Sequence, residues 1–203
     1  KPEILPLVSD FATTEVREKI KRRLTHFLER KIKTLFEPLF NVQRDESVIG
    51  ISKGLSFMLI ESLGVIPRSV VMSEVKQLTQ EERSKLRKHG LRFGQFTIFF
   101  PALIKPAPTQ LRLILWSKFL GMDRIPSAPP PGLVSVEMDG SEPKGYFPRA
   151  GLRAAGNRAI RIDMLERVVD LIRKENTEDG FEATSEMLSL TGMSHDQFAD
   201  LME

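Results

Sequence analysis

Few residues in the chain have the types and spacing that catalysis or metal binding requires. Cysteine is absent, which excludes disulfides, thiol catalysis and cysteine-based zinc sites. The three histidines, His26, His89 and His195, form no His-x-x-x-His pair. The sequence also lacks a glycine-rich phosphate loop followed by Lys-Ser or Lys-Thr, and a serine in a nucleophile elbow. We therefore expect no catalytic residue, metal ligand or bound cofactor in this segment.

One group of acids shares a face of a helix predicted for residues 163–174: Asp163, Glu166 and Asp170. Basic residues of the same helix are close enough to neutralise them: Arg167, Arg173 and Lys174. A structural ladder of ion pairs is therefore the default interpretation. The spacing of Asp163 and Glu166 also predicts a capping box that opens this helix.

The most suggestive polar cluster is basic and contains Arg149, Arg153, Arg158 and Arg161, with Lys144 nearby. No acid occurs between Glu142 and Asp163, and guanidinium groups bind phosphate oxygens bidentately. Gly156-Asn157 predicts a two-residue hairpin turn within residues 151–162. This register places Arg153 and Arg158 on one face and Arg161 on the other. Contact with nucleic acid and pairing with an acidic tail both stay open.

A second basic cluster contains Lys85, Arg87, Lys88 and Arg92. Lys85, Arg87 and Lys88 lie on a predicted helix at 80–89, opened by a Thr79–Glu82 capping box, and Arg92 follows it. Another helix is predicted just before, at 68–78. Residues 91–100 are predicted to form a hairpin with its turn at Gly94-Gln95 and a positive φ at the glycine. This order is that of a helix-turn-helix followed by a wing. It is typical of groove-reading proteins, but helical proteins that bind no nucleic acid show it too.

Charge and composition limit the class of protein further. The 203 residues are 41% hydrophobic and 28% charged, which is ordinary for a globular protein. The net charge of the chain is +3. Residues 176–203 carry seven acids and no Lys or Arg, a charge of −7, so residues 1–175 carry a charge of +10. A basic body with an acidic tail favours an anionic partner or a tail that folds back. No apolar run approaches the ~20 residues of a membrane helix, so we expect a cytoplasmic protein and no membrane partner.

The remaining patterns predict a mainly helical α+β protein. We expect a helix bundle with helix-turn-helix-like units and one or two small antiparallel hairpins. Further helices are predicted at 14–40, at 47–63 with Ser47 as N-cap, and at 110–120 with Thr109 as N-cap. Val134, Val136 and Met138 alternate as in a short strand, and Thr184, Gly192, Ser194 and Gln197 mark the ends of two tail helices. The Pro-rich segment 126–132 is predicted to link a helical domain, 1–125, to a smaller one, 133–203, and packing of the two as one unit stays open.

Two stretches carry a resemblance to a known family. They are Gly-Leu-Arg-Phe-Gly-Gln-Phe-Thr-Ile-Phe-Phe-Pro-Ala-Leu-Ile-Lys-Pro-Ala-Pro-Thr-Gln-Leu-Arg-Leu-Ile-Leu-Trp at 90–116 and Gly-Asn-Arg-Ala-Ile-Arg-Ile-Asp-Met-Leu-Glu-Arg at 156–167. The chain resembles the C-terminal accessory region of alphaproteobacterial ATP-dependent helicases that are similar to the mitochondrial degradosome RNA helicase. In that family, ATP is hydrolysed by two RecA-like motor domains that precede this region. The resemblance implies that ATP and Mg²⁺ belong to those domains, and that this chain is a fragment without catalytic residues.

We therefore expect a non-catalytic accessory domain of a superfamily-two helicase. Its expected partners are single-stranded RNA or DNA and the motor domains of the same chain, and we expect a monomer. An alternative is a protein-interaction or structural module that packs through the apolar helix 110–120 and the Phe-rich stretch 93–100. An independent DNA-binding regulator using residues 68–100 is a further alternative, and an autonomous enzyme is the last.

Overall fold

Helices dominate the chain, as the sequence predicts. The computed structural model describes residues 2–7, 13–175 and 180–202. Within them lie ten α-helices and two three-stranded antiparallel sheets, which confirms a mainly helical α+β fold. The α-helices are α1 (Thr14–Leu35), α2 (Glu37–Arg44), α3 (Gly50–Glu61), α4 (Met72–Gln77), α5 (Gln80–Lys88), α6 (Pro106–Phe119), α7 (Tyr146–Arg149), α8 (Ile162–Ile172), α9 (Ser185–Thr191) and α10 (His195–Met202). Two 3₁₀ turns, η1 (Arg68–Val71) and η2 (Pro101–Ile104), complete the helical part.

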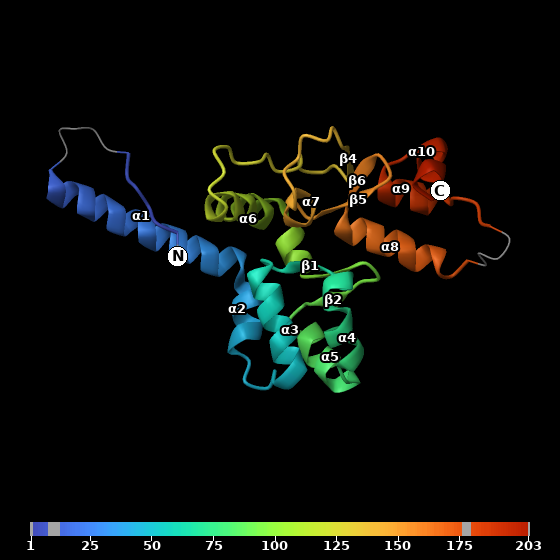
Figure 1. Cartoon of the computed structure of the whole chain (residues 1–203), viewed down its shortest axis with the longest axis horizontal. Coiled ribbons are helices and arrows are strands. Elements are labelled where there is room, and N and C mark those ends of the chain that lie inside the picture. Colours follow the sequence, from blue (N-terminus) through green and yellow to red (C-terminus); the bar gives the residue numbers. More distant parts are fainter. Residues whose placement is uncertain (1, 8–12, 176–179, 203) are drawn as a thin grey trace.

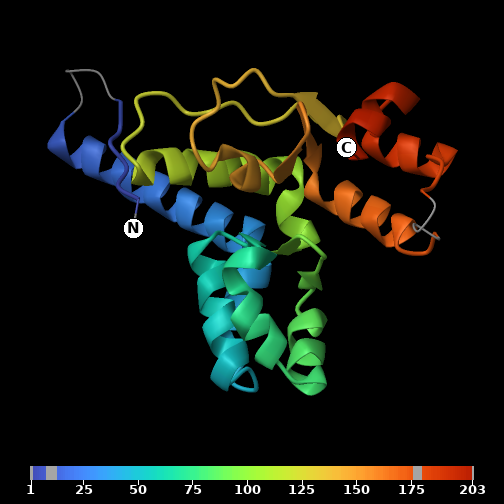
Figure 2. The ribbon, with the colours of Figure 1, turned by 45° about the vertical axis from the view of Figure 1, so that its right-hand side comes forward.

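The main core lies among α2, α3, α4 and α5. Its buried side chains include Val42, Leu55, Val75 and Leu86, all at most 1% exposed. Figure 1 shows these helices as one bundle, with α6, α7 and α8–α10 arranged in a row on its other side. Figure 2 shows α1 running beside α6 and reaching beyond the bundle. No residue of α1 is fully buried, so this helix adds little to the core.

The stretch predicted as one helix, 14–40, forms two helices, α1 and α2, because the chain breaks at Phe36. Thr13 caps the start of α1, because its Oγ1 accepts the Val16 N–H at 3.4 Å. Pro38 falls in the first turn of α2, where a proline without an N–H is tolerated. Inside a continuous helix it would clash with the preceding turn. The break lets Phe36, 3% exposed, enter the core.

Both sheets gain a strand that the sequence analysis did not pair. The first has the order β1 (Val65–Pro67), β3 (Thr97–Phe99), β2 (Arg92–Phe93). The second has the order β4 (Ser135–Glu137), β6 (Arg158–Arg161), β5 (Leu152–Ala155). The predicted hairpin around Gly156-Asn157 is confirmed, and Arg153 pairs with Ile160 in its register. The order in which the strands pair depends on contacts between distant segments, which periodicity does not report.

Several predicted helix starts are corrected by the structure. Ser47 does not cap α3; its N–H donates to Asp45 Oδ1 at 2.8 Å, and α3 begins at Gly50. Thr109 lies inside α6, which begins three residues earlier at Pro106. Its hydroxyl donates to the carbonyls of Leu103 and Ile104 instead. The reciprocal bonds of Thr79 with Glu82 and of Ser194 with Gln197 are confirmed.

The Pro-rich segment 126–132 contains neither helix nor strand, and the parts of the chain on its two sides pack together. α7 contacts β1, and α8 contacts η2. The Tyr146 hydroxyl donates to the Ser127 carbonyl at 2.7 Å, which ties the segment to α7.

Candidate nucleic-acid interface

The arginines of the β5–β6 hairpin are occupied by contacts within the protein. Arg158 donates to Ser135 Oγ at 3.3 Å and to Glu137 Oε1 at 3.1 Å. Arg161 makes two bonds to the Asp163 carboxylate, at 2.7 and 3.1 Å. These two side chains therefore bring little unpaired charge to the hairpin.

The other two predicted arginines of this cluster lie on aromatic rings. The Arg149 guanidinium lies 5.4 Å from the centre of the Trp116 ring, and burial lowers the pKa of this arginine. Arg153 lies 4.5 Å from the ring centre of Phe96. The pairing register places Arg153 and Arg158 on one face of the hairpin and Arg161 on the other, as predicted. The four arginines thus do not form one basic face.

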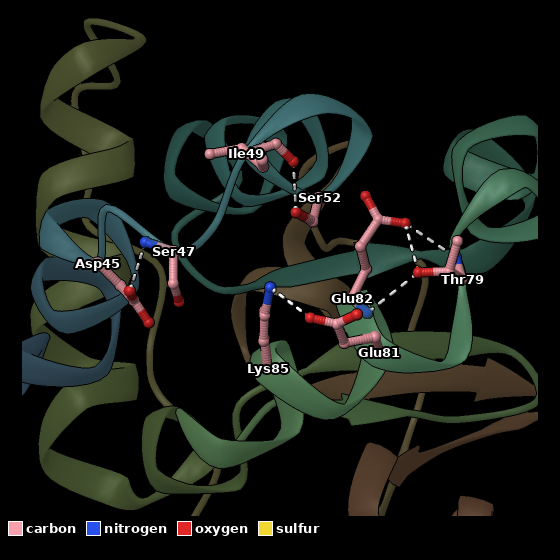
Figure 3. Close-up of polar contacts among 8 residues, drawn as sticks. All are labelled: Asp45, Ser47, Ile49, Ser52, Thr79, Glu81, Glu82 and Lys85. Carbon is pink, nitrogen blue, oxygen red and sulfur yellow. Dashed lines mark hydrogen bonds and ion pairs between the residues drawn. The ribbon is translucent and has the colours of Figure 1, made fainter.

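The second basic cluster, Lys85, Arg87, Lys88 and Arg92, keeps side chains that are not paired within the described residues. The capping box of Thr79 and Glu82 fixes the start of α5 (Figure 3). Lys85 forms an ion pair at 2.8 Å with Glu81, which lies one helical turn before it. Arg87 lies 5.7 Å from the ring centre of Phe93. Lys88 and Arg92 are exposed, and within the described residues their side chains have no hydrogen-bonding or ionic partner. This cluster therefore keeps cationic groups that a ligand can reach.

A polar cleft of about 530 Å³ lies between the β2–β3 hairpin and α8. Its lining brings two predicted residues, Arg87 and Arg92, together with three that the prediction missed: Arg68, Arg167 and Arg173. Figure 1 shows the hairpin directly below α8. Arg68 donates to the Gly94 carbonyl at 2.7 Å, and Arg173 donates to Gln95 Oε1 at 3.3 Å. Like Arg92, Arg167 is exposed and has no partner among the described side chains.

Three acids also line the cleft, and two of them are already satisfied. Asp163 is held by Arg161. Glu166 accepts the N–H groups of Gln95, Phe96 and Thr97 at 2.5, 3.0 and 2.8 Å. Asp170 is exposed. Asp163 is paired with Arg161, so five arginines face only two further carboxylates across the cleft, and its net charge is positive.

Glu166 does not form the predicted capping box or an ion-pair ladder. Its side chain is 8% exposed and turns away from its own helix toward the loop 94–96. Burial raises the pKa of Glu166, while the three N–H donors act in the opposite direction. A Cβ at residue 94 would collide with this carboxylate, so Gly94 is required for close approach. Its φ is not positive, contrary to the turn predicted at Gly94-Gln95.

Arg112 is a second buried charged residue that connects the parts of the chain before and after the Pro-rich segment. Glu166 reaches from the later part to the earlier one, and Arg112 reaches from the earlier part to the later one. Arg112 of α6 is fully buried and donates to the Arg149 carbonyl at 2.6 Å and the Leu63 carbonyl at 3.2 Å. It also donates to Thr109 Oγ1 at 3.2 Å. Burial, and to a smaller extent the charge of Arg149, lower the pKa of Arg112 to about 9, so it stays charged at neutral pH. The sequence of this apolar helix does not indicate that Arg112, its one arginine, is buried.

Groups of metal-ligating side chains and membrane-spanning helices are both absent from the residues that the structure describes. Residues 2–7, 13–175 and 180–202 contain no group of three or more metal-ligating side chains. No helix among these residues has the length and apolar character to cross a bilayer. The comparisons with family models, curated proteins and solved structures found no match to this chain.

Proposed function

We propose that this segment is a non-catalytic accessory domain of an ATP-dependent helicase, and that it contacts single-stranded RNA or DNA through the arginine-lined cleft. ATP and Mg²⁺ would bind in motor domains outside this segment. The observation that carries the proposal is the set of five arginines around one cleft, two of which have no partner among the residues that the structure describes. Guanidinium groups without internal partners are free to bind phosphate oxygens.

The two stretches that resemble the helicase family lie against each other in the structure. Stretch 90–116 contains the β2–β3 hairpin, and stretch 156–167 contains Glu166. Glu166 binds three successive backbone N–H groups of that hairpin. The two stretches therefore meet at one wall of the cleft, as residues that shape a common site would.

The test is fluorescence anisotropy of this protein with a labelled single-stranded RNA, titrated across salt. We expect binding that weakens steeply as salt rises, because each phosphate contact releases condensed counterions. The double variant Arg92→Gln, Arg167→Gln should lose about tenfold or more in affinity at low salt. The control Lys118→Gln, Arg124→Gln removes two exposed, unpartnered cations outside the cleft and should bind nearly as the unmodified protein does. Equal losses in both variants, or no binding at low salt, would contradict the proposal.

A protein-docking role is the second candidate, and exposed apolar side chains at the end of α6 favour it. Phe119 is 87% exposed and Leu120 is 52% exposed, whereas Trp116 of the same helix is buried at 7% exposed. Motor domains of the same chain are the proposed partner for this surface, and we propose a cytoplasmic monomer. Co-purification of separately expressed motor domains, lost in Phe119→Ser, would support docking.

A further inference from the structure

An exposed aromatic ring lies at the tip of the β2–β3 hairpin, next to the cleft. Phe96 is 38% exposed and is not part of any buried cluster of the described residues. Its neighbour Gln95 lines the cleft, and its neighbour Thr97 lines a smaller hollow of about 240 Å³ together with Arg153. The ring therefore sits on a ridge between two hollows rather than in the core.

Arg153 fixes one side of this ring. Its guanidinium lies 4.5 Å from the ring centre, a distance at which a cation is attracted to the face of an aromatic ring. Arg153 is half-buried, and within the described residues its side chain has no hydrogen bond or ion pair. Phe96 and Arg153 thus form a pair that combines an exposed aromatic surface with a positive charge.

The backbone beneath the pair is rigidly held. Glu166 accepts the N–H groups of residues 95, 96 and 97, as described above. The Phe96 carbonyl accepts the Arg68 N–H at 2.8 Å, and the Gly94 N–H donates to the Thr97 carbonyl at 2.9 Å. A loop fixed by this many bonds presents its tip in one orientation, which lowers the entropy cost of binding a ligand.

We infer that Phe96 and Arg153 form a stacking platform for one unpaired base of a strand whose phosphates lie in the adjacent cleft. This inference rests on the proposed function and assigns it a base-binding residue. An aromatic face combined with a guanidinium attracts a flat, electron-rich ring system, and the cleft beside it attracts phosphate. A nucleotide carries both groups covalently joined, so the ridge and the cleft together match the chemistry of one strand.

The experiment compares two labelled single strands of about 12 nucleotides, a length within the range that one such module covers. One is oligothymidylate, and the other is an abasic strand of the same length and charge. The unmodified protein should bind the strand with bases more tightly. Phe96→Leu should weaken binding of oligothymidylate about tenfold and leave binding of the abasic strand nearly unchanged.

Two controls separate stacking from other effects. Phe119→Leu shortens another exposed phenylalanine, away from the cleft, and should leave both affinities unchanged. Thermal unfolding of Phe96→Leu should match that of the unmodified protein, because the ring lies outside the core. Equal binding of both strands, or an equal loss on both in Phe96→Leu, would overturn the stacking platform and leave the cleft proposal standing. Failure of the unmodified protein to bind either strand at low salt would overturn both.

Discussion

The two basic regions of this protein differ in what their arginines already touch. On the β5–β6 hairpin, Arg158 and Arg161 are bonded to carboxylates, and Arg149 of the preceding helix α7 lies against a tryptophan. Around the cleft, Arg92 and Arg167 have no partner within the described residues. The sequence ranked the hairpin first because its arginines are dense and no acid lies among them. The acids that neutralise them, Glu137 and Asp163, come from just outside that stretch.

The difference teaches that a charge is available to a ligand only if the fold leaves it unpaired. Both regions also depend on one junction, where the two sides of the Pro-rich segment meet. Arg112 crosses that junction to the Arg149 carbonyl, and Glu166 crosses it to the hairpin N–H groups. Each buried charge is satisfied mainly by backbone groups, which fixes the position of whole segments rather than of single side chains.

The largest expected effect comes from removing the buried cation that supports both regions. Arg112→Met should lower the free energy of unfolding by about 3 kcal/mol, because two carbonyls and a hydroxyl lose their donors inside the protein. Chemical denaturation monitored by circular dichroism measures the change. Arg124→Met, at an exposed position, should change stability by at most about 0.5 kcal/mol. Equal stability of the two variants would show that Arg112 does not hold the junction.

A smaller effect, confined to the cleft side, is expected from Glu166→Ala. Loss of the carboxylate leaves the N–H groups of residues 95–97 without their acceptor, at a cost of about 2 kcal/mol. Amide hydrogen exchange at these three residues should accelerate, while exchange in the β5–β6 hairpin should not change. Asp170→Ala, one turn further along α8 and exposed, should leave exchange in the loop unaltered. Unchanged protection of residues 95–97 in Glu166→Ala would contradict the role given to this side chain.

The smallest effect lies away from both regions and depends on pH. The Ser47 hydroxyl, and next His89, lower the pKa of Asp45 to about 2. Because the folded pKa lies below the usual 3.8, this carboxylate contributes stability above pH 3.8 that is lost as pH falls toward 2. The melting temperature of Asp45→Asn should fall less between pH 4 and pH 2 than that of the unmodified protein. The melting temperature of Glu46→Gln should fall as much as that of the unmodified protein. Identical pH profiles for both variants would exclude the contribution of Asp45.

Local patterns in the sequence predicted much of the fold. The capping box at Thr79, the turn at Gly156-Asn157 and the helical repeats each involve residues close in sequence, so spacing alone reveals them. The break at Phe36 also has a local cause in the sequence, because Pro38 lies in the first turn of the next helix, α2. Such features need no knowledge of what packs against them.

The candidate site was predicted only in part, because it depends on contacts between distant residues. Arg87 and Arg92 were named from their cluster, but Arg167 and Arg173 were assigned to a ladder with the acids of their own helix. Glu166 instead reaches a loop about 70 residues earlier in the chain. A glycine inside an extended, aromatic stretch was the available signal, since Gly94 marks a close approach of another group.

The most direct test of the account compares the salt dependence of strand binding for two matched double variants. Arg92→Gln with Arg167→Gln removes two cleft arginines that have no partner within the described residues. Arg149→Gln with Arg158→Gln, the hairpin variant, removes Arg149 of α7 and Arg158 of the adjacent hairpin, which both make contacts within the protein. The account predicts that the slope of log affinity against log salt falls by about 1.4 for the cleft variant, corresponding to two lost phosphate contacts. The slope for the hairpin variant should stay close to that of the unmodified protein. A fall in slope for the hairpin variant alone would contradict the cleft as the site of binding.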